Sequence, residues 1–147
     1  MPKSLLLDIV TPDRLVLSRD VESVTGTGVA GAFTILPLHI PFFTALAVGY
    51  LSCRLAGETR TVFVAGGFAD VAFDKVLVLA EAAELPEEID VDRAKKARER
   101  AEARLAAQRQ EEIDYVRAKA ALQRAILRLR LRELAASGLA HRSAGRA

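Results

Sequence analysis

The spacing of apolar residues changes at residues 89–94, and this change constrains the fold more than any other feature of the chain. Before it, apolar residues recur at every second position between glycines and prolines, which is typical of half-buried strands. After it, they recur every three or four positions without glycine or proline, which is typical of amphipathic helices. Asp90 is a good N-cap because its carboxylate can accept from the free amides of a first helical turn. The chain is therefore expected to pass from a β domain to helices here.

Nine short segments before this point have strand-like alternation, with turn-forming residues between them. They are residues 5–10, 15–18, 21–25, 32–36, 44–48, 50–55, 59–65, 67–73 and 76–80. Gly49 is interpreted as a turn between two of them. None of the intervening segments is long enough for a helix that would connect parallel strands. The first part is therefore predicted to be an antiparallel sandwich or barrel.

Two helices are predicted in the second part. The first spans residues 91–109, and the second follows a short break near residues 110–112, with Asp114 as its N-cap. Their apolar stripes are Ala94, Ala97, Ala101 and Leu105 in the first helix, and Ala118, Ala121, Leu122, Ala125, Ile126 and Leu129 in the second. Because the break is short, the helices should form an antiparallel hairpin. Since large apolar residues are few, the isolated hairpin should be only marginally stable and should pack against another part of the protein.

The composition allows one core that two small units share. The chain has 147 residues, of which 51% are hydrophobic, and its two periodicities predict a β-sandwich at residues 1–84 and a helical hairpin at residues 85–136. Residues 137–147 are small, polar and basic, and are expected to form a frayed tail. No segment approaches the roughly 20 apolar residues that span a bilayer. The start lacks the features of a signal peptide, so we expect a cytoplasmic location.

Few residue types are present that could hold a metal or close a disulfide. Cys53 is the single cysteine, so an internal disulfide is excluded. With only His39 and His141 as additional soft ligands, a zinc-type cluster is not expected.

Positive charge is concentrated in the predicted helices. Residues 1–84 contain six bases and nine acids, whereas residues 85–147 contain fifteen bases and ten acids. The second helix carries Arg117, Lys119, Arg124, Arg128, Arg130 and Arg132 against one acid, Glu133. Because arginines four residues apart repel each other, such a helix is expected to face an anionic partner. Nucleic acid, an acidic protein helix and a phosphate ligand all fit by charge, although Tyr115 alone offers little stacking for bases.

Three motifs suggest chemistry, but their context argues against it. Residues 26–31 match G-x-G-x-x-G, yet a strand follows rather than the helix that a dinucleotide site needs, so we expect a loop in the sandwich. His39 is flanked by prolines and should be hydrogen-bonded within a turn. Glu87 and Glu88 are interpreted as exposed charges that the helix dipole favours. We therefore predict no catalytic residue and no enzymatic activity.

Four dispersed motifs, taken together, resemble a known family. They are residues 9–14, residues 31–39 with Pro41 and Thr44, residues 66–68, and residues 89–94. In this order they are similar to the epsilon subunit of F-type ATP synthases, over residues 5–134. Thr34 stands where the family usually has glycine, which should affect only a local turn.

The resemblance implies an α+β fold, with an N-terminal antiparallel β-sandwich of about ten strands followed by a C-terminal antiparallel two-helix hairpin. It implies that the sandwich binds the gamma subunit and sits against the membrane c-ring, coupling proton-driven rotation to catalysis. It further implies that the hairpin either folds on the sandwich or extends to the beta subunit and inhibits ATP hydrolysis. Such a central-stalk subunit is non-catalytic, requires no cofactor, has no nucleic-acid partner, and lies peripherally at the cytoplasmic face of the bacterial plasma membrane.

The resemblance also implies a regulatory ATP site on the folded hairpin. The residues that match the family's site are Glu84, Ile89, Asp90, Arg93, Ala94, Arg100, Arg124 and Arg128. The alternative is that these arginines serve the inhibitory contact or the gamma subunit. A rival hypothesis of a different class is a freestanding module that binds an anionic ligand or nucleic acid through the basic hairpin.

Overall fold

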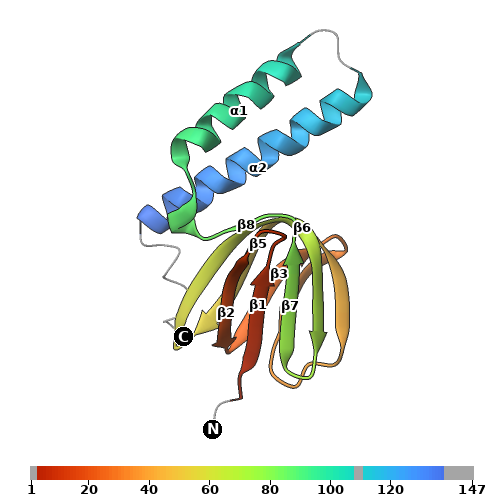
Figure 1. The fold of residues 1–147 in the computed structure, drawn as a ribbon, viewed down its shortest axis with the longest axis vertical. Helices are drawn as coiled ribbons and strands as arrows, with labels where there is room; N and C mark the ends of the chain where they lie inside the picture. Colours follow the sequence, from red (N-terminus) through yellow and green to blue (C-terminus); the bar gives the residue numbers. More distant parts are fainter. Residues whose placement is uncertain (1–2, 108–110, 138–147) are drawn as a thin grey trace.

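A β-sandwich with a helical hairpin at one end makes up the computed structural model, which describes residues 3–107 and 111–137 (Figure 1). The strands are β1 (Leu5–Val10), β2 (Leu15–Val21), β3 (Ser23–Gly28), β4 (Gly31–Ile35), β5 (Phe42–Leu55), β6 (Glu58–Ala72), β7 (Lys75–Ala80) and β8 (Ala83–Glu84). A 3-10 turn, η1 (Pro86–Glu88), leads to the helices α1 (Val91–Ala106) and α2 (Glu112–Ala136). The predicted α+β class, with the sandwich first and two helices after it, is confirmed.

The strands form one curled, mixed sheet in the order β2-β1-β7-β6-β5-β3-β4, with β8 paired to β6. The described strands number eight, so the expectation of about ten was too high. The prediction of purely antiparallel pairing was also wrong, because β1 and β7 are parallel. No crossover helix is needed for this pair, since strands β2 to β6 themselves form the connection.

The strand count is lower because β5 and β6 each join two segments that the sequence predicted separately. Gly49 is not a turn but pairs with Val64 inside the β5–β6 ladder. In β6 the glycines Gly66 and Gly67 have φ of +87° and +117°, which only glycine adopts readily. A Cβ atom on Gly67 would lie 2.0 Å from the Leu79 carbonyl oxygen. The resulting bend lets β6 pair with β8 before the glycines and with β7 after them.

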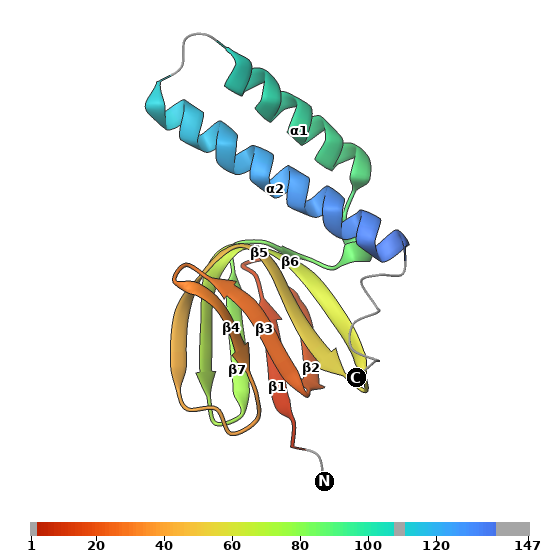
Figure 2. The same ribbon diagram turned by 180° about the vertical axis from the view of Figure 1, so that it is seen from behind.

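Two cores hold the molecule together. The larger lies inside the sandwich, where alternate residues of β1 and the other strands are buried. The smaller one consists of Phe63, Ala65, Ile89 and Leu131, and it joins β6 and the linker to α2. In both ribbon views α2 lies between α1 and the sandwich (Figure 2). The prediction that the hairpin leans on another part of the protein is thus confirmed.

The helix boundaries follow the predictions in part. Asp90 is the N-cap of α1, and its Oδ1 accepts a hydrogen bond from the Arg93 amide at 3.1 Å. Asp114 is not the N-cap of α2, which begins at Glu112 after Glu111. Asp114 instead lies in the first turn, where the helix dipole favours a carboxylate. The predicted end of the first helix at residue 109, and the tail from residue 138 onward, lie outside the described residues.

The glycine-rich segment was expected to be a loop, but only Val29 and Ala30 form a turn, whereas His39 is hydrogen-bonded within a connection as predicted. Gly26 and Gly28 are in β3, and Gly31 begins β4, so residues 26–31 form a β-hairpin. The Nδ1 atom of His39 lies 2.7 Å from the Ile40 carbonyl oxygen, within the β4–β5 connection. Neither α1 nor α2, as described, is long and apolar enough to cross a membrane.

Candidate functional site

A pocket of about 240 Å³ opens where the end of the sandwich, η1 and both helices meet. It is lined by Glu84, Glu88, Asp90, Arg93, Ala94, Ala97, Arg100 and Arg128. These residues come from β8, η1, the start of α1 and the second half of α2. The pocket therefore exists only while the hairpin is folded on the sandwich.

Six of the eight residues that the sequence singled out line this pocket: Glu84, Asp90, Arg93, Ala94, Arg100 and Arg128. Ile89 does not line it, because its side chain is buried in the smaller core. Arg124 lies one turn before Arg128 on α2 and lines a neighbouring cavity between α2 and the β5–β6 face. The pocket thus gathers three of the four expected arginines.

Sequence reasoning missed two residues of the pocket wall, Glu88 and Ala97. Ala97 was assigned only to the packing face of the helix, although it lies four residues after Arg93 and three before Arg100. That spacing places the three residues on one helical face, and it was the available signal. Glu88 was interpreted as an exposed charge, because its partner is 74 positions away in the sequence.

Each acidic side chain of the pocket already has a defined partner. Both carboxylate oxygens of Glu84 accept from Nε of Arg128, at 3.2 and 3.0 Å. Oε2 of Glu88 accepts from Nη2 of Arg14 at 2.5 Å and from the Leu85 amide at 3.1 Å. Asp90 caps α1. The three carboxylates are therefore already paired with arginine side chains or backbone amides of the protein.

The Arg14 pair also fixes the charge state of Glu88. The hydrogen bond from Arg14 lowers the pKa of Glu88, and the backbone amide of Leu85 acts in the same direction. The same hydrogen bond raises the pKa of Arg14. The ionised Glu88 thus ties η1 to the β1–β2 turn through Arg14.

Two of the three arginines in the pocket, Arg93 and Arg100, form no ion pair among the described residues. Both residues are exposed. Guanidinium groups bind phosphate and carboxylate groups by charge-assisted hydrogen bonds. The first turn of α1, with its positive dipole end, lies at the same place. This arrangement suits an anion.

The volume of the pocket limits what it can enclose. At about 240 Å³ it is smaller than the roughly 300–1,000 Å³ of pockets that bury a drug-sized ligand. It therefore fits a group of phosphate size better than a whole nucleotide.

Further contacts dock α2 on the sandwich beside the pocket. The hydroxyl of Tyr50 donates to the Leu127 carbonyl oxygen at 2.7 Å, and burial raises the pKa of Tyr50. The guanidinium carbon of Arg128 lies 4.6 Å from the centre of the Phe63 ring, a cation–π contact. These contacts fix the second half of α2 relative to β5 and β6.

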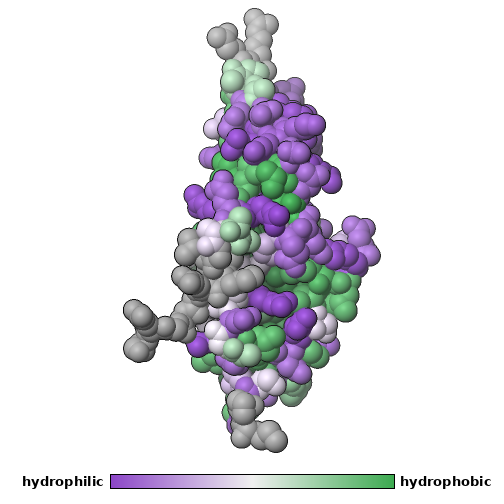
Figure 3. Space-filling model, turned by 90° about the vertical axis from the view of Figure 1, so that its left-hand side faces the viewer, coloured by the Kyte–Doolittle hydropathy of each residue, from purple (hydrophilic) through white to green (hydrophobic). Residues whose placement is uncertain are grey.

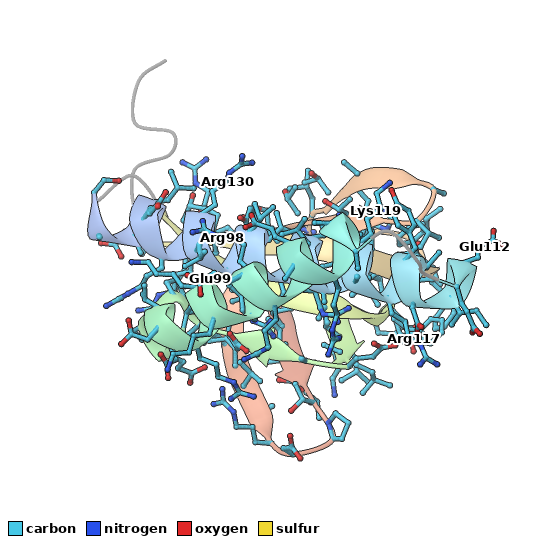
Figure 4. All side chains as sticks on the ribbon, turned by 90° about the horizontal axis from the view of Figure 1, so that it is seen from above. Arg98, Glu99, Glu112, Arg117, Lys119 and Arg130 are labelled. Atoms are coloured by element: carbon cyan, nitrogen blue, oxygen red, sulfur yellow. The ribbon has the colours of Figure 1, made fainter. Side chains whose placement is uncertain are left out.

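The outward surface of the hairpin is rich in charge. Viewed from above, charged side chains project from both helices, among them Arg98 of α1 and Arg117 and Arg130 of α2 (Figure 4). Viewed from the side, hydrophilic residues alternate with hydrophobic patches on both hairpin and sandwich (Figure 3). Of the basic residues that the sequence identified in α2, Arg117, Lys119 and Arg130 are exposed, whereas the other three are half-buried.

The chain matches two models of one protein family, one for each of its two parts. Residues 4–86 match the beta-sandwich domain of the ATP synthase delta/epsilon chain, and residues 87–133 match its long alpha-helix domain.

Curated proteins similar to this chain include ATP synthase epsilon chains. The chain is 58% identical to that of Nitratidesulfovibrio vulgaris strain DP4 over 106 residues, which cover 72% of this chain and 79% of the relative. It is 51% identical to that of Syntrophobacter fumaroxidans, with the same coverage of both chains.

Solved structures with a similar fold come from ATP synthases. A chain of the Euglena gracilis mitochondrial ATP synthase aligns with a TM-score of 0.72 and 25% identity, over 93% of this chain and 83% of the other. A chain from the central stalk and c-ring of the Tetrahymena thermophila mitochondrial enzyme aligns with a TM-score of 0.62 and 14% identity, over 88% and 97%. At that identity the second match shows the fold alone.

Proposed function

Because the chain belongs to the ATP synthase delta/epsilon family, we propose that it is the epsilon subunit of a bacterial F-type ATP synthase and rotates as part of its central stalk. The observation that carries this proposal is the match of both domains, in order, over residues 4–133. The subunit has no catalytic task of its own and couples rotation to catalysis elsewhere in the complex. It is held at the cytoplasmic face of the membrane through the complex.

The end of the sandwich away from the hairpin is the part that we assign to the c-ring. Leu38, Ile40 and Phe73 have exposed fractions of 65%, 75% and 96% there. The β4–β5 connection and the β6–β7 turn that carry them are joined by a hydrogen bond from the Leu38 amide to Oδ1 of Asp74, at 2.6 Å. Solvent-exposed apolar side chains that cluster in this way are typical of a protein interface.

A second apolar surface, on β5 and β6, is assigned to the gamma subunit. The rings of Phe43 and Phe68 stack on each other with their centres 5.5 Å apart, and they are 65% and 49% exposed. Aromatic side chains of this kind are enriched in the centres of interfaces. The two surfaces together support a sandwich that is held between two partners.

The hairpin is assigned the regulatory task. Its contacts with the sandwich are confined to the smaller core and a few polar contacts of α2, so a small change in free energy suffices to release it. Once released, the basic face of α2 would meet an acidic segment of the beta subunit and inhibit ATP hydrolysis. Replacing Arg124, Arg128 and Arg132 together with alanine is expected to raise hydrolysis by the assembled enzyme.

We assign the pocket to the phosphate groups of a regulatory ATP, which would favour the folded hairpin. The ligand would contact groups from the sandwich end, α1 and α2, which only the folded state brings together. A ligand that binds one state alone stabilises that state by RT ln(1 + [L]/Kd), about 2.7 kcal/mol at a hundredfold excess over Kd. ATP would thus suppress the inhibitory state, and the subunit would block hydrolysis when ATP is scarce.

The experiment that tests the ATP assignment is thermal unfolding of the purified chain with and without millimolar ATP. We expect ATP to raise the melting temperature of the wild type, and Arg93→Ala to abolish this shift. Arg98→Ala is the matched control, since Arg98 is on the same helix but does not line the pocket. Absence of a shift in the wild type, or an equal shift in Arg93→Ala, would reject the assignment.

The assignment to the complex has its own test. Isolation of the ATP synthase from membranes should recover this chain at one copy per complex. A freestanding binding module, the rival hypothesis, would be recovered without the complex.

A further inference from the structure

Phe63 and Glu84 together form a platform for one arginine of the pocket. They occupy opposite positions in the antiparallel ladder between β6 and β8. Residues that are directly opposite in a ladder place their side chains on the same face of the sheet. Arg128, from the second half of α2, lies on this platform and contacts both side chains.

The contacts of Arg128 restrict its guanidinium in two directions. Nε lies 3.2 and 3.0 Å from the two carboxylate oxygens of Glu84, which fixes the Nε edge of the group. The guanidinium carbon lies over the Phe63 ring, 4.6 Å from the ring centre. The charged side chains are only 23% exposed for Arg128 and 30% for Glu84, so water competes weakly with these contacts.

This geometry leaves the terminal nitrogens of Arg128 for another acceptor. An arginine side chain has five N–H groups, of which Nε carries one and the two terminal nitrogens carry four. Among the described residues, the ion pair of Arg128 is made with Glu84 through Nε. Arg128 also lines the pocket that contains Arg93 and Arg100.

We propose that Glu84 is a positioning residue, which acts on a bound nucleotide through Arg128. Glu84 and Phe63 hold the guanidinium ready for the phosphate groups, so that little conformational entropy is lost when they bind. This proposal rests on the regulatory ATP site assigned above. It changes the expected role of Glu84 from a direct contact with the ligand to a support for the residue that makes the contact.

The variant that isolates positioning from charge is Glu84→Asp. It keeps the negative charge, so the electrostatic potential at the pocket is nearly unchanged, but the shorter side chain no longer reaches Nε of Arg128 with both oxygens. Glu87→Asp is the matched control, because Glu87 is an exposed residue of η1 outside the pocket wall. Both variants are made in the full chain.

Calorimetry with two probes, ATP and inorganic triphosphate, measures the effect. We expect the wild type to bind both, and Glu84→Asp to weaken both by the same factor, about tenfold, as for loss of a charge-assisted hydrogen bond. Glu87→Asp should bind both like the wild type. In NMR spectra of the ligand-free protein, the Nε–H proton of Arg128 should exchange faster with solvent in Glu84→Asp, while the backbone amides of α2 keep their wild-type protection. Loss of protection along α2 would instead show that Glu84 acts by docking the hairpin, and would overturn the positioning role.

The remaining outcomes overturn the proposal in distinguishable ways. If Glu84→Asp weakens ATP binding but not triphosphate binding, Glu84 contacts the nucleoside directly. If the variant weakens neither, or if the wild type binds ATP without binding triphosphate, Arg128 is not positioned for phosphate. In these cases the ATP site itself stands. If the wild type binds neither probe, the ATP site and the role of Glu84 are both rejected.

Discussion

Replacing Leu131 with alanine tests whether the smaller core holds the hairpin on the sandwich. Leu131 is fully buried and belongs to the cluster that joins α2 to β6 and the linker. Replacement of a buried leucine by alanine costs about 2–5 kcal/mol. We expect about 2–3 kcal/mol, because α2 rests on the outside of the sheet and can move partly into the space. Since about 1.4 kcal/mol is a factor of ten, the undocked population should rise about 30- to 150-fold.

Amide hydrogen exchange, followed peptide by peptide, measures this change. Exchange should accelerate in α2 and in β8, whereas β1 and β2 should keep their protection because their core is separate. Leu134→Ala is the control, since Leu134 is on the same helix but is 36% exposed. Unchanged exchange in α2 would show that other contacts hold the hairpin. Equal acceleration throughout the sandwich would show that the two cores are one cooperative unit.

Further predictions concern single contacts and the division of the chain. Tyr50→Phe should destabilise the docked hairpin by about 1 kcal/mol through loss of its hydrogen bond to α2, measured as faster exchange in α2. Gly67→Ala should destabilise the sandwich by more than about 2 kcal/mol in urea unfolding, because its φ is +117° and the added Cβ meets a β7 carbonyl. Gly57→Ala, with open space around it, should cost about 1 kcal/mol. The folded-state pKa of Glu88 is lowered, so its contribution to stability is present above its ordinary pKa and should be lost as pH falls through the folded value. In Glu88→Gln this part of the pH dependence of the melting temperature should disappear. A fragment of residues 1–84 should fold and melt cooperatively by circular dichroism, which tests the predicted domain boundary.

The sequence predicted the parts of this fold that depend on neighbours along the chain. Strand and helix periods depend on alternate and every-third-or-fourth residues, so the change at residues 89–94 located the boundary between the two kinds of structure. Asp90 was recognisable as an N-cap for the same reason, since its partner is only three residues away. Local patterns did not determine how strands pair. Gly49 carries the signal of a turn, but its pairing with Val64 across the sheet makes it the interior of a strand.

The candidate site shows the same division. The match of Glu84, residues 89–94 and the later arginines to the family's site is visible in the sequence, and it points to six of the eight pocket residues. Tertiary structure alone decided what those residues do to one another. Glu84 and Arg128 are 44 positions apart, and the Phe63 ring that supports the guanidinium comes from a third element. Such contacts depend on strand register and on the docking of α2, which are set by burial over the whole molecule, and no local pattern encodes them.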